Sequence, residues 1–125
     1  MEVTPLIAGD RQVIESYGAS SFRVSGIAYE GAILVFPDAT LRWAEAARCE
    51  ELGRLSLEPV IERGGVEILL IGCGRRMAPL PGELRRRLRE AGIVADTMDT
   101  GAACRTYNVL LAEDRRVAAA LLPSG

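Results

Sequence analysis

Residues 66–74 read Val-Glu-Ile-Leu-Leu-Ile-Gly-Cys-Gly, and this stretch decides the fold class of the chain. Residues 66–71 are an almost unbroken apolar run, which is typical of a central strand buried on both faces. After the glycines, residues 81–91 have the leucine spacing of an amphipathic helix, and Gly92 ends that pattern. A buried strand followed by a glycine loop and a helix predicts an α/β fold.

The same alternation continues on both sides of this unit. Residues 57–63 predict a short helix that stops at a pair of glycines. Downstream we expect three further elements, namely a strand over 93–98, a helix capped by Thr100 that runs to about Asp114, and a strand over 117–122.

The N-terminal third of the chain is rich in β-strands. Glycines separate short apolar or alternating runs, which predict strands over residues 12–14, 22–24, 27–29, 31–36 and 40–43. A tight hairpin is expected at Tyr29-Glu30-Gly31. No linker or repeat interrupts the 125 residues. We therefore expect a single compact α/β domain, residues 1–125, with a mixed β-sheet, a β-rich N-terminal part and about three helices packed on the sheet.

Missing residue types exclude several classes of enzyme. The chain has no histidine, and all 15 of its basic residues are arginine. It therefore lacks an imidazole base, a histidine zinc ligand, a Schiff-base lysine and a P-loop lysine. Its three cysteines, Cys49, Cys73 and Cys104, have no CxxC spacing. Asp96 and Asp99 are three residues apart, so an extended strand points them to opposite faces. We expect no disulfide framework, no metal and no cofactor.

Charge and hydropathy limit the partners and the location. The formal net charge of −2 gives no general attraction to nucleic acid or to anionic membranes. No apolar run approaches the ~20 residues of a transmembrane segment. Residues 1–10 have neither a secretory signal nor an arginine-rich transit pattern. We therefore expect a soluble, cytoplasmic protein.

The loop after the buried strand, Gly72-Cys73-Gly74-Arg75-Arg76-Met77, is the first candidate site. Glycines at the carboxyl end of a strand let the backbone approach a ligand, and the next helix offers free N–H groups. Arg75 and Arg76 add two guanidinium groups suited to an anion. The dinucleotide fingerprint fails, because Met77 stands at its third glycine position. The alternative is a turn that needs glycine only for its backbone angles.

The second candidate site is the start of the helix that begins at Thr100, where Met98, Thr100, Arg105 and Asn108 lie. We expect it to lie beside the glycine loop, because both sit at strand ends in adjacent α/β units. Asn108 is mid-helix, where asparagine is unfavourable, so its amide is expected to bond a neighbouring loop such as residues 72–74.

Cys104 is a candidate nucleophile, because a thiol in the first turn of a helix and beside a cation can have a lowered pKa. A nucleophile also needs a base, and free cysteine is among the most buried residue types. We expect Cys104 to be buried and unreactive.

Two further features are interpreted as surface. Arg85, Arg86, Arg87 and Arg89 alternate with Glu83 and Glu90 at helical spacing, which predicts ion pairs on a solvated helix face. No aromatic residues interleave with these arginines, so binding to nucleic acid is not expected. Leu41 and Trp43 would indicate a contact surface if both were exposed.

Four segments together resemble a known family. They are residues 18–24 (GASSFRV), 69–74 (LLIGCG), 98–110 (MDTGAACRTYNVL) and 116–121 (RVAAAL), and the resemblance runs from about Thr4 to Leu122. The chain resembles small bacterial and archaeal proteins of unassigned function that are related to mitochondrial NADH dehydrogenase (complex I) assembly factor 3 and to an adipogenesis-associated protein. The resemblance implies a mixed-sheet α/β fold, no established enzymatic activity and a role through protein contacts.

Three functions remain open at this point. The leading hypothesis is a non-enzymatic protein-interaction domain, with an unidentified protein partner, that assists assembly of a membrane or respiratory complex. The first alternative is a small-molecule or anion-binding protein that uses the Gly72–Gly74 loop and the Thr100 helix start. The second alternative is a thiol enzyme built on Cys73 or Cys104.

Overall fold

The structure, a computed structural model, describes residues 11–44 and 48–125. The expectations for residues 1–10, including the start of the resemblance at Thr4, lie outside the described residues. The described elements, in chain order, are β1 (Ile14–Tyr17), β2 (Ser21–Val24), β3 (Ile27–Glu30), β4 (Ile33–Phe36), β5 (Ala39–Arg42), the 3-10 helix η1 (Cys49–Glu51), α1 (Glu58–Arg63), β6 (Ile68–Cys73), α2 (Gly82–Glu90), β7 (Val94–Met98), α3 (Thr100–Ala112) and β8 (Val117–Leu122).

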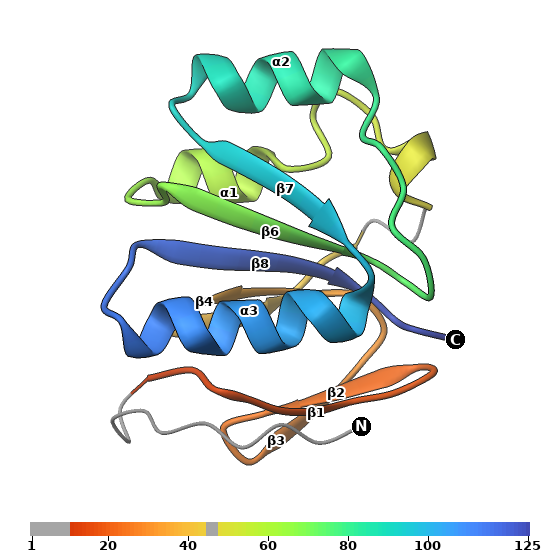
Figure 1. The fold of residues 1–125 in the computed structure, drawn as a ribbon, viewed down its shortest axis with the longest axis vertical. Helices are drawn as coiled ribbons and strands as arrows, with labels where there is room; N and C mark the ends of the chain where they lie inside the picture. Colours follow the sequence, from red (N-terminus) through yellow and green to blue (C-terminus); the bar gives the residue numbers. More distant parts are fainter. Residues whose placement is uncertain (1–10, 45–47) are drawn as a thin grey trace.

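The strands form two sheets, which Figure 1 shows on either side of α3. The first three strands make an antiparallel sheet in the order β1-β2-β3, and the other five make a mixed sheet in the order β5-β4-β8-β6-β7. In the larger sheet β8 pairs with β4 antiparallel and with β6 parallel. The α/β class with three α-helices is confirmed, and the expectation that all strands join one sheet is wrong.

The five-stranded sheet is buried on both faces because its central strands carry apolar residues at every position. Alternate side chains of a strand point to opposite faces. Leu69 and Ile71 therefore pack in a cluster with the leucines of α2, while Leu70 packs with Ala103 and Tyr107 of α3. The second cluster also holds the inner residues of β1 and β2. One face of the large sheet is thus covered by α1 and α2, and the other by α3 and the small sheet.

The order of the last three strands explains why α2 and α3 lie on opposite faces. From β6 the chain crosses to β7 on one side, and from β7 it returns to β8 on the other side of β6. Crossover connections between parallel strands are right-handed in almost all proteins, so connections that run in opposite directions place their helices on opposite faces. The loops after β6 and β7 consequently diverge at the carboxyl edge of the sheet.

Several predicted boundaries shift because of tertiary partners. The strand expected over 66–71 is β6, two residues later, because β8 continues to Leu122 and pairs there with Cys73. The strand expected over 12–14 begins at Ile14, since the N–H of Gln12 donates to the carbonyl of Pro37, outside the β1–β2 ladder. The helix expected to reach Asp114 ends at Ala112. The strands expected over 22–24, 27–29, 31–36, 40–43, 93–98 and 117–122 and the helices over 57–63 and 81–91 are present within two residues at each end.

The hairpin predicted at residues 29–31 is wrong. The tight turn is Ser25-Gly26, between the paired residues Val24 and Ile27, and both turn residues have positive φ (45° and 84°). Such backbone angles match the twist of a two-residue hairpin. Gly31, with φ of 80°, instead turns the chain out of the small sheet and into β4 of the large one.

Asn108 fastens the small sheet to α3. Its side-chain oxygen accepts from the N–H of Ile14 at 3.1 Å, and its amide donates to the carbonyl of the same residue at 2.8 Å. The predicted bond to residues 72–74 is therefore wrong, and the amide serves a strand of the other sheet. Nearby, the buried hydroxyl of Tyr107 donates to the carbonyl of Gln12 at 3.0 Å.

Arg87 joins α2 to α1 and not to Glu83 of its own helix. Its guanidinium donates to both carboxylate oxygens of Glu58, at 2.9 and 2.8 Å. This contact is the largest cause of the lowered pKa of Glu58.

Trp43 is 6% exposed and Leu41 is 40% exposed, so these two residues do not form the joint surface that the sequence left open.

We predict that Asn108→Ala lowers the free energy of unfolding by about 2–6 kcal/mol, because two buried backbone groups of Ile14 lose their partner at ~1–3 kcal/mol each. Val109→Ala, at a side chain that is 56% exposed, is the matched control and should change stability by less than about 0.5 kcal/mol. Urea unfolding followed by circular dichroism measures both. Equal stability of the two variants would contradict the role given to Asn108.

Candidate functional site

The glycine loop and the start of α3 meet at the carboxyl edge of the large sheet, as the sequence predicts. The N–H of Gly74 donates to Oγ1 of Thr100 at 2.8 Å, and the N–H of Thr100 donates to the carbonyl of Gly74 at 2.8 Å. This edge lies where the loops of adjacent strands diverge, which is the usual ligand position in open α/β sheets. The expected juxtaposition is therefore confirmed.

Gly72 is needed for close packing at this edge. A Cβ at this position would lie 3.0 Å from Cα of Thr100 and 3.0 Å from Cδ2 of Leu121. Such distances are shorter than ordinary van der Waals contacts, and one neighbour is backbone. The glycine thus brings β6 and α3 together, which is the structural alternative stated from the sequence.

The first turn of α3 already uses hydrogen-bonding groups that an anion would need. Asp99, and not Thr100 as predicted, is the N-cap, and its carboxylate accepts from the N–H of Ala102 at 2.9 Å. Oγ1 of Thr100 donates to the carbonyl of Leu122 at 2.6 Å, so this hydroxyl links the loop, α3 and the end of β8. With a carboxylate at the helix start, the geometry does not favour the anion hypothesis.

The remaining predicted site residues are spread around this edge. Arg75 and Arg76 are exposed, and Met77 beside them is 62% exposed. Met98 is half-buried at the end of β7. Arg105 is exposed and donates to the hydroxyl of Tyr17 at 3.3 Å. The side-chain amide of Asn108 is hydrogen-bonded to Ile14 of β1, as described above. Gly72 and Thr100 are thus buried, Gly74 is half-buried, and the two arginines with Met77 form an exposed loop.

A hollow of about 400 Å³ adjoins the loop, and half-buried Cys73 lies in its wall. The wall also contains Gly31, Ala32, Arg48, Gly74, Arg75, Leu122, Pro123 and Gly125. The sequence placed Gly74 and Arg75 at this edge, but nothing in it indicated Arg48. That residue is the N-cap of η1, and the fold brings it to the hollow that Cys73 also lines.

The three cysteines differ in environment. Cys104 is fully buried, and burial raises the pKa of its thiol to about 12. At Cys73 the pKa is lowered to about 7, chiefly by a hydrogen bond from Cys49 and further by backbone hydrogen bonds from Ala78 and Met98, against the opposing effect of burial. The predicted burial of Cys104 is confirmed, and Cys73 is the thiol with both access and acidity.

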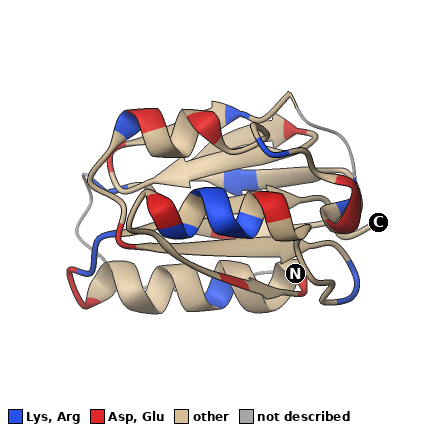
Figure 2. Ribbon diagram, turned by 90° about the horizontal axis from the view of Figure 1, so that it is seen from above, with Lys and Arg blue, Asp and Glu red and all other residues tan. Residues whose placement is uncertain are grey.

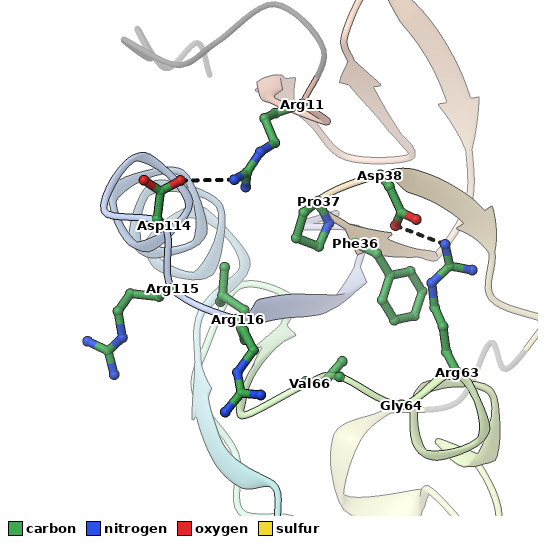
Figure 3. A pocket seen from close by; sticks show the side chains of 12 residues that line it. Arg11, Phe36, Pro37, Asp38, Arg63, Gly64, Val66, Asp114, Arg115 and Arg116 are labelled. Atoms are coloured by element: carbon green, nitrogen blue, oxygen red, sulfur yellow. Dashed lines mark hydrogen bonds and ion pairs between the residues drawn. The ribbon is translucent and has the colours of Figure 1, made fainter.

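A second hollow, of about 560 Å³, lies at the opposite edge, before the amino ends of β6 and β8. Figure 3 shows an ion pair on each side of it, Arg11 with Asp114 and Arg63 with Asp38, each 2.9 Å between nitrogen and oxygen. The hydrogen bond from Arg63 is the largest cause of the lowered pKa of Asp38. The guanidinium of Arg63 also lies 4.5 Å from the ring centre of Phe36.

This second hollow was not predicted as a site. Its residues are Arg11 and three turns, 36–38, 63–66 and 114–117, and the sequence signal was only the arginines beside Gly64 and Val117. Two of its four arginines are paired with aspartates in its wall, and a third, Arg116, is paired with Glu67. Basic and acidic residues are interspersed along the helices as well (Figure 2).

Among residues 11–44 and 48–125, no three side chains of histidine, cysteine, aspartate or glutamate gather as a metal site would require. Over the same residues, none of the helices has the length and apolar character needed to span a membrane.

Comparison with known proteins gives the family. The model of a family described as "protein of unknown function (DUF498/DUF598)" matches residues 14–122, from the first residue of β1 to the last residue of β8. The chain belongs to this family. The resemblance identified from the sequence is thereby confirmed.

The chain is similar to three proteins of known sequence or structure. An uncharacterised protein of Rhodobacter capsulatus is 39% identical over 88% of this chain and 83% of its own length. NADH dehydrogenase [ubiquinone] 1 alpha subcomplex assembly factor 3 of Danio rerio is 36% identical over 89% of this chain, which spans 64% of that protein. A crystal structure described as an outer membrane protein from Bartonella henselae is 40% identical, with a TM-score of 0.82, covering 92% of this chain and 97% of that one.

We predict that Gly72→Ala destabilises the protein by about 1–3 kcal/mol, because its new Cβ forces the backbone of Thr100 away from β6. Gly82→Ala is the matched control, since a Cβ there meets nothing within 4 Å and alanine favours the first turn of α2. Thermal unfolding measures both. If Gly72→Ala has the same melting temperature as the wild type, the close approach of β6 and α3 does not require glycine.

We predict that iodoacetamide labels Cys73 of the native protein and leaves Cys104 unmodified, because Cys73 lines a hollow while Cys104 is fully buried. The thiolate is the reactive form, so the rate at Cys73 should fall as the pH drops through about 7, its lowered pKa. Peptide mass spectrometry over a pH series measures the two sites. Rapid native labelling of Cys104 would contradict the assignment.

Proposed function

We propose that this protein acts by binding another protein and that it assists the assembly of a membrane or respiratory complex. The observation that carries the proposal is the similarity to proteins named NADH dehydrogenase assembly factor 3, at 36% identity over 89% of the chain for the Danio rerio protein. The family as a whole is described as one of unknown function. The role of the relatives is therefore extended to this chain as a hypothesis.

The exposed loop formed by Arg75, Arg76 and Met77 is the contact surface that we propose. Its base is held by the two hydrogen bonds between Gly74 and Thr100, so the loop is presented from a rigid edge. Arginine and methionine are enriched in protein interfaces, where they supply forked hydrogen bonds and adaptable apolar contact. The buried members of the predicted site, Gly72, Thr100 and Asn108, support this surface from below and do not reach a partner.

Two proposed properties accompany this role. We propose a cytoplasmic location, and we treat the 125 residues as one functional domain, within which the family model matches residues 14–122. The catalytic alternative on Cys104 has no support, since that thiol is buried and its pKa is raised. Nothing at the start of α3 favours the anion-binding alternative, because the carboxylate of Asp99 lies there and already accepts a hydrogen bond from the N–H of Ala102.

The test is deletion of the gene in its native host. We expect less assembled NADH dehydrogenase in membranes, measured on native gels and as NADH:quinone oxidoreductase activity, with succinate dehydrogenase unchanged as the control. An expression copy of the wild-type chain should restore the complex. Unchanged amounts of NADH dehydrogenase after deletion would overturn the assembly role.

The loop is tested separately by complementation with Arg75→Glu/Arg76→Glu. The matched control is Arg85→Glu/Arg86→Glu, which makes the same charge change at exposed positions of α2. Both variants should fold with nearly wild-type melting temperatures, because all four side chains are exposed. Only the loop variant should fail to restore the complex. If both variants complement equally, the loop is not the contact surface, although the assembly role survives.

A further inference from the structure

Cys49 and Cys73 bring two thiols together in the fold, although they are far apart in the sequence. Cys49 begins η1, and Cys73 is the last residue of β6. Cys49 lies in the core cluster on the α1/α2 face of the large sheet, and Cys73 packs against that cluster. Arg48, the residue before Cys49, lines the same hollow as Cys73, and each thiol shifts the pKa of the other. Both cysteines are free in this structure. The CxxC spacing that would have indicated a pair from the sequence is absent, so only the fold reveals it.

The two thiols have unequal access to solvent. Cys73 is half-buried and lines the hollow of about 400 Å³ beside the glycine loop. Cys49 is 1% exposed, so its thiol lies inside the protein. Two guanidinium groups, those of Arg48 and Arg75, line the same hollow. A small oxidant can therefore reach Cys73 directly, while Cys49 is positioned to react from the protein interior.

The groups around Cys73 suit a thiolate. In that form its sulfur accepts hydrogen bonds from the Cys49 thiol and from the backbones of Ala78 and Met98, which lower its pKa, while burial and the charge of Glu50 oppose them. As a neutral thiol it can donate to the carbonyl of Ala78, 3.6 Å away. The same hydrogen bond raises the pKa of Cys49 well above its ordinary value, so Cys49 keeps its proton.

We propose that Cys49 and Cys73 are a peroxide-oxidisable pair that closes to a reversible intramolecular disulfide. Sγ of the Cys73 thiolate attacks one oxygen of a hydroperoxide. The O–O bond breaks, the leaving oxygen takes a proton, and Cys73 becomes a sulfenic acid. Sγ of Cys49 then attacks Sγ of Cys73, and the displaced hydroxide leaves as water with the proton of Cys49. In balance, two thiols and one hydroperoxide give one disulfide, one alcohol (water, for hydrogen peroxide) and one water.

The disulfide would tie η1 to the end of β6, directly beneath the loop of Arg75 and Arg76. Reduction by a dithiol reverses it. The proposal concerns the chemistry of these two residues alone, and it stands whether or not the protein assists the assembly of a complex.

Hydrogen peroxide is the probe that tests the pair. Native wild-type protein treated with about one equivalent should lose two hydrogen atoms in intact-mass analysis, and digestion under non-reducing conditions should yield a peptide linking Cys49 to Cys73. Dithiothreitol should restore the original mass. Cys104→Ser is the matched control and should behave as the wild type, because that buried thiol takes no part.

Single variants separate the two steps. In Cys49→Ala the reaction should stop at the sulfenic acid, which dimedone traps as an adduct on Cys73, and Cys73→Ala should give neither adduct nor linked peptide. If Cys49→Ala fails to fold, the wild-type measurement alone decides. The proposal is overturned if the wild type shows no linked Cys49–Cys73 peptide, if Cys73 passes directly to sulfinic acid, or if the disulfide joins two chains.

Discussion

The position of β8 in the middle of the large sheet is the constraint on which the rest of the structure depends. All six of its residues are buried, so its backbone N–H and C=O groups must find partners within the protein. They find them in β4, which comes early in the chain, and in β6, which comes from its middle. Once β8 pairs with both strands, α2 and α3 are placed on opposite faces, and the small sheet packs on the face that α3 covers.

This arrangement produces the crevice where α/β proteins usually bind ligands and then closes it with the protein's own groups. Thr100 is the residue responsible, since its backbone and hydroxyl together bond Gly74 and Leu122. Asp99 takes the hydrogen bond at the start of α3 that an anion would need. The edge is therefore a rigid support for an exposed loop, which agrees better with the proposed role in protein contact than with ligand binding.

The same closure explains why Cys73 differs from the other cysteines. It is the residue between Gly72, packed against α3, and Gly74, bonded to Thr100, so its side chain is directed to the other face of the sheet. There it lines a hollow and packs against the core cluster that contains Cys49. A position fixed by packing on one face of the strand thus sets the chemical environment of a thiol on the other.

The sequence by itself determined β6, α2, β7, α3 and β8, because each has a local signal: an unbroken apolar run, leucines at helical spacing, a glycine stop. It also determined that the glycine loop and the helix start meet, since loops at the carboxyl ends of neighbouring parallel strands share an edge. Only the tertiary structure decided that the N-terminal strands form a separate sheet, that Asn108 bonds Ile14, that Arg87 bonds Glu58, and that Cys49 reaches Cys73. These contacts join residues distant in the chain, and neither periodicity nor spacing carries information about such partners.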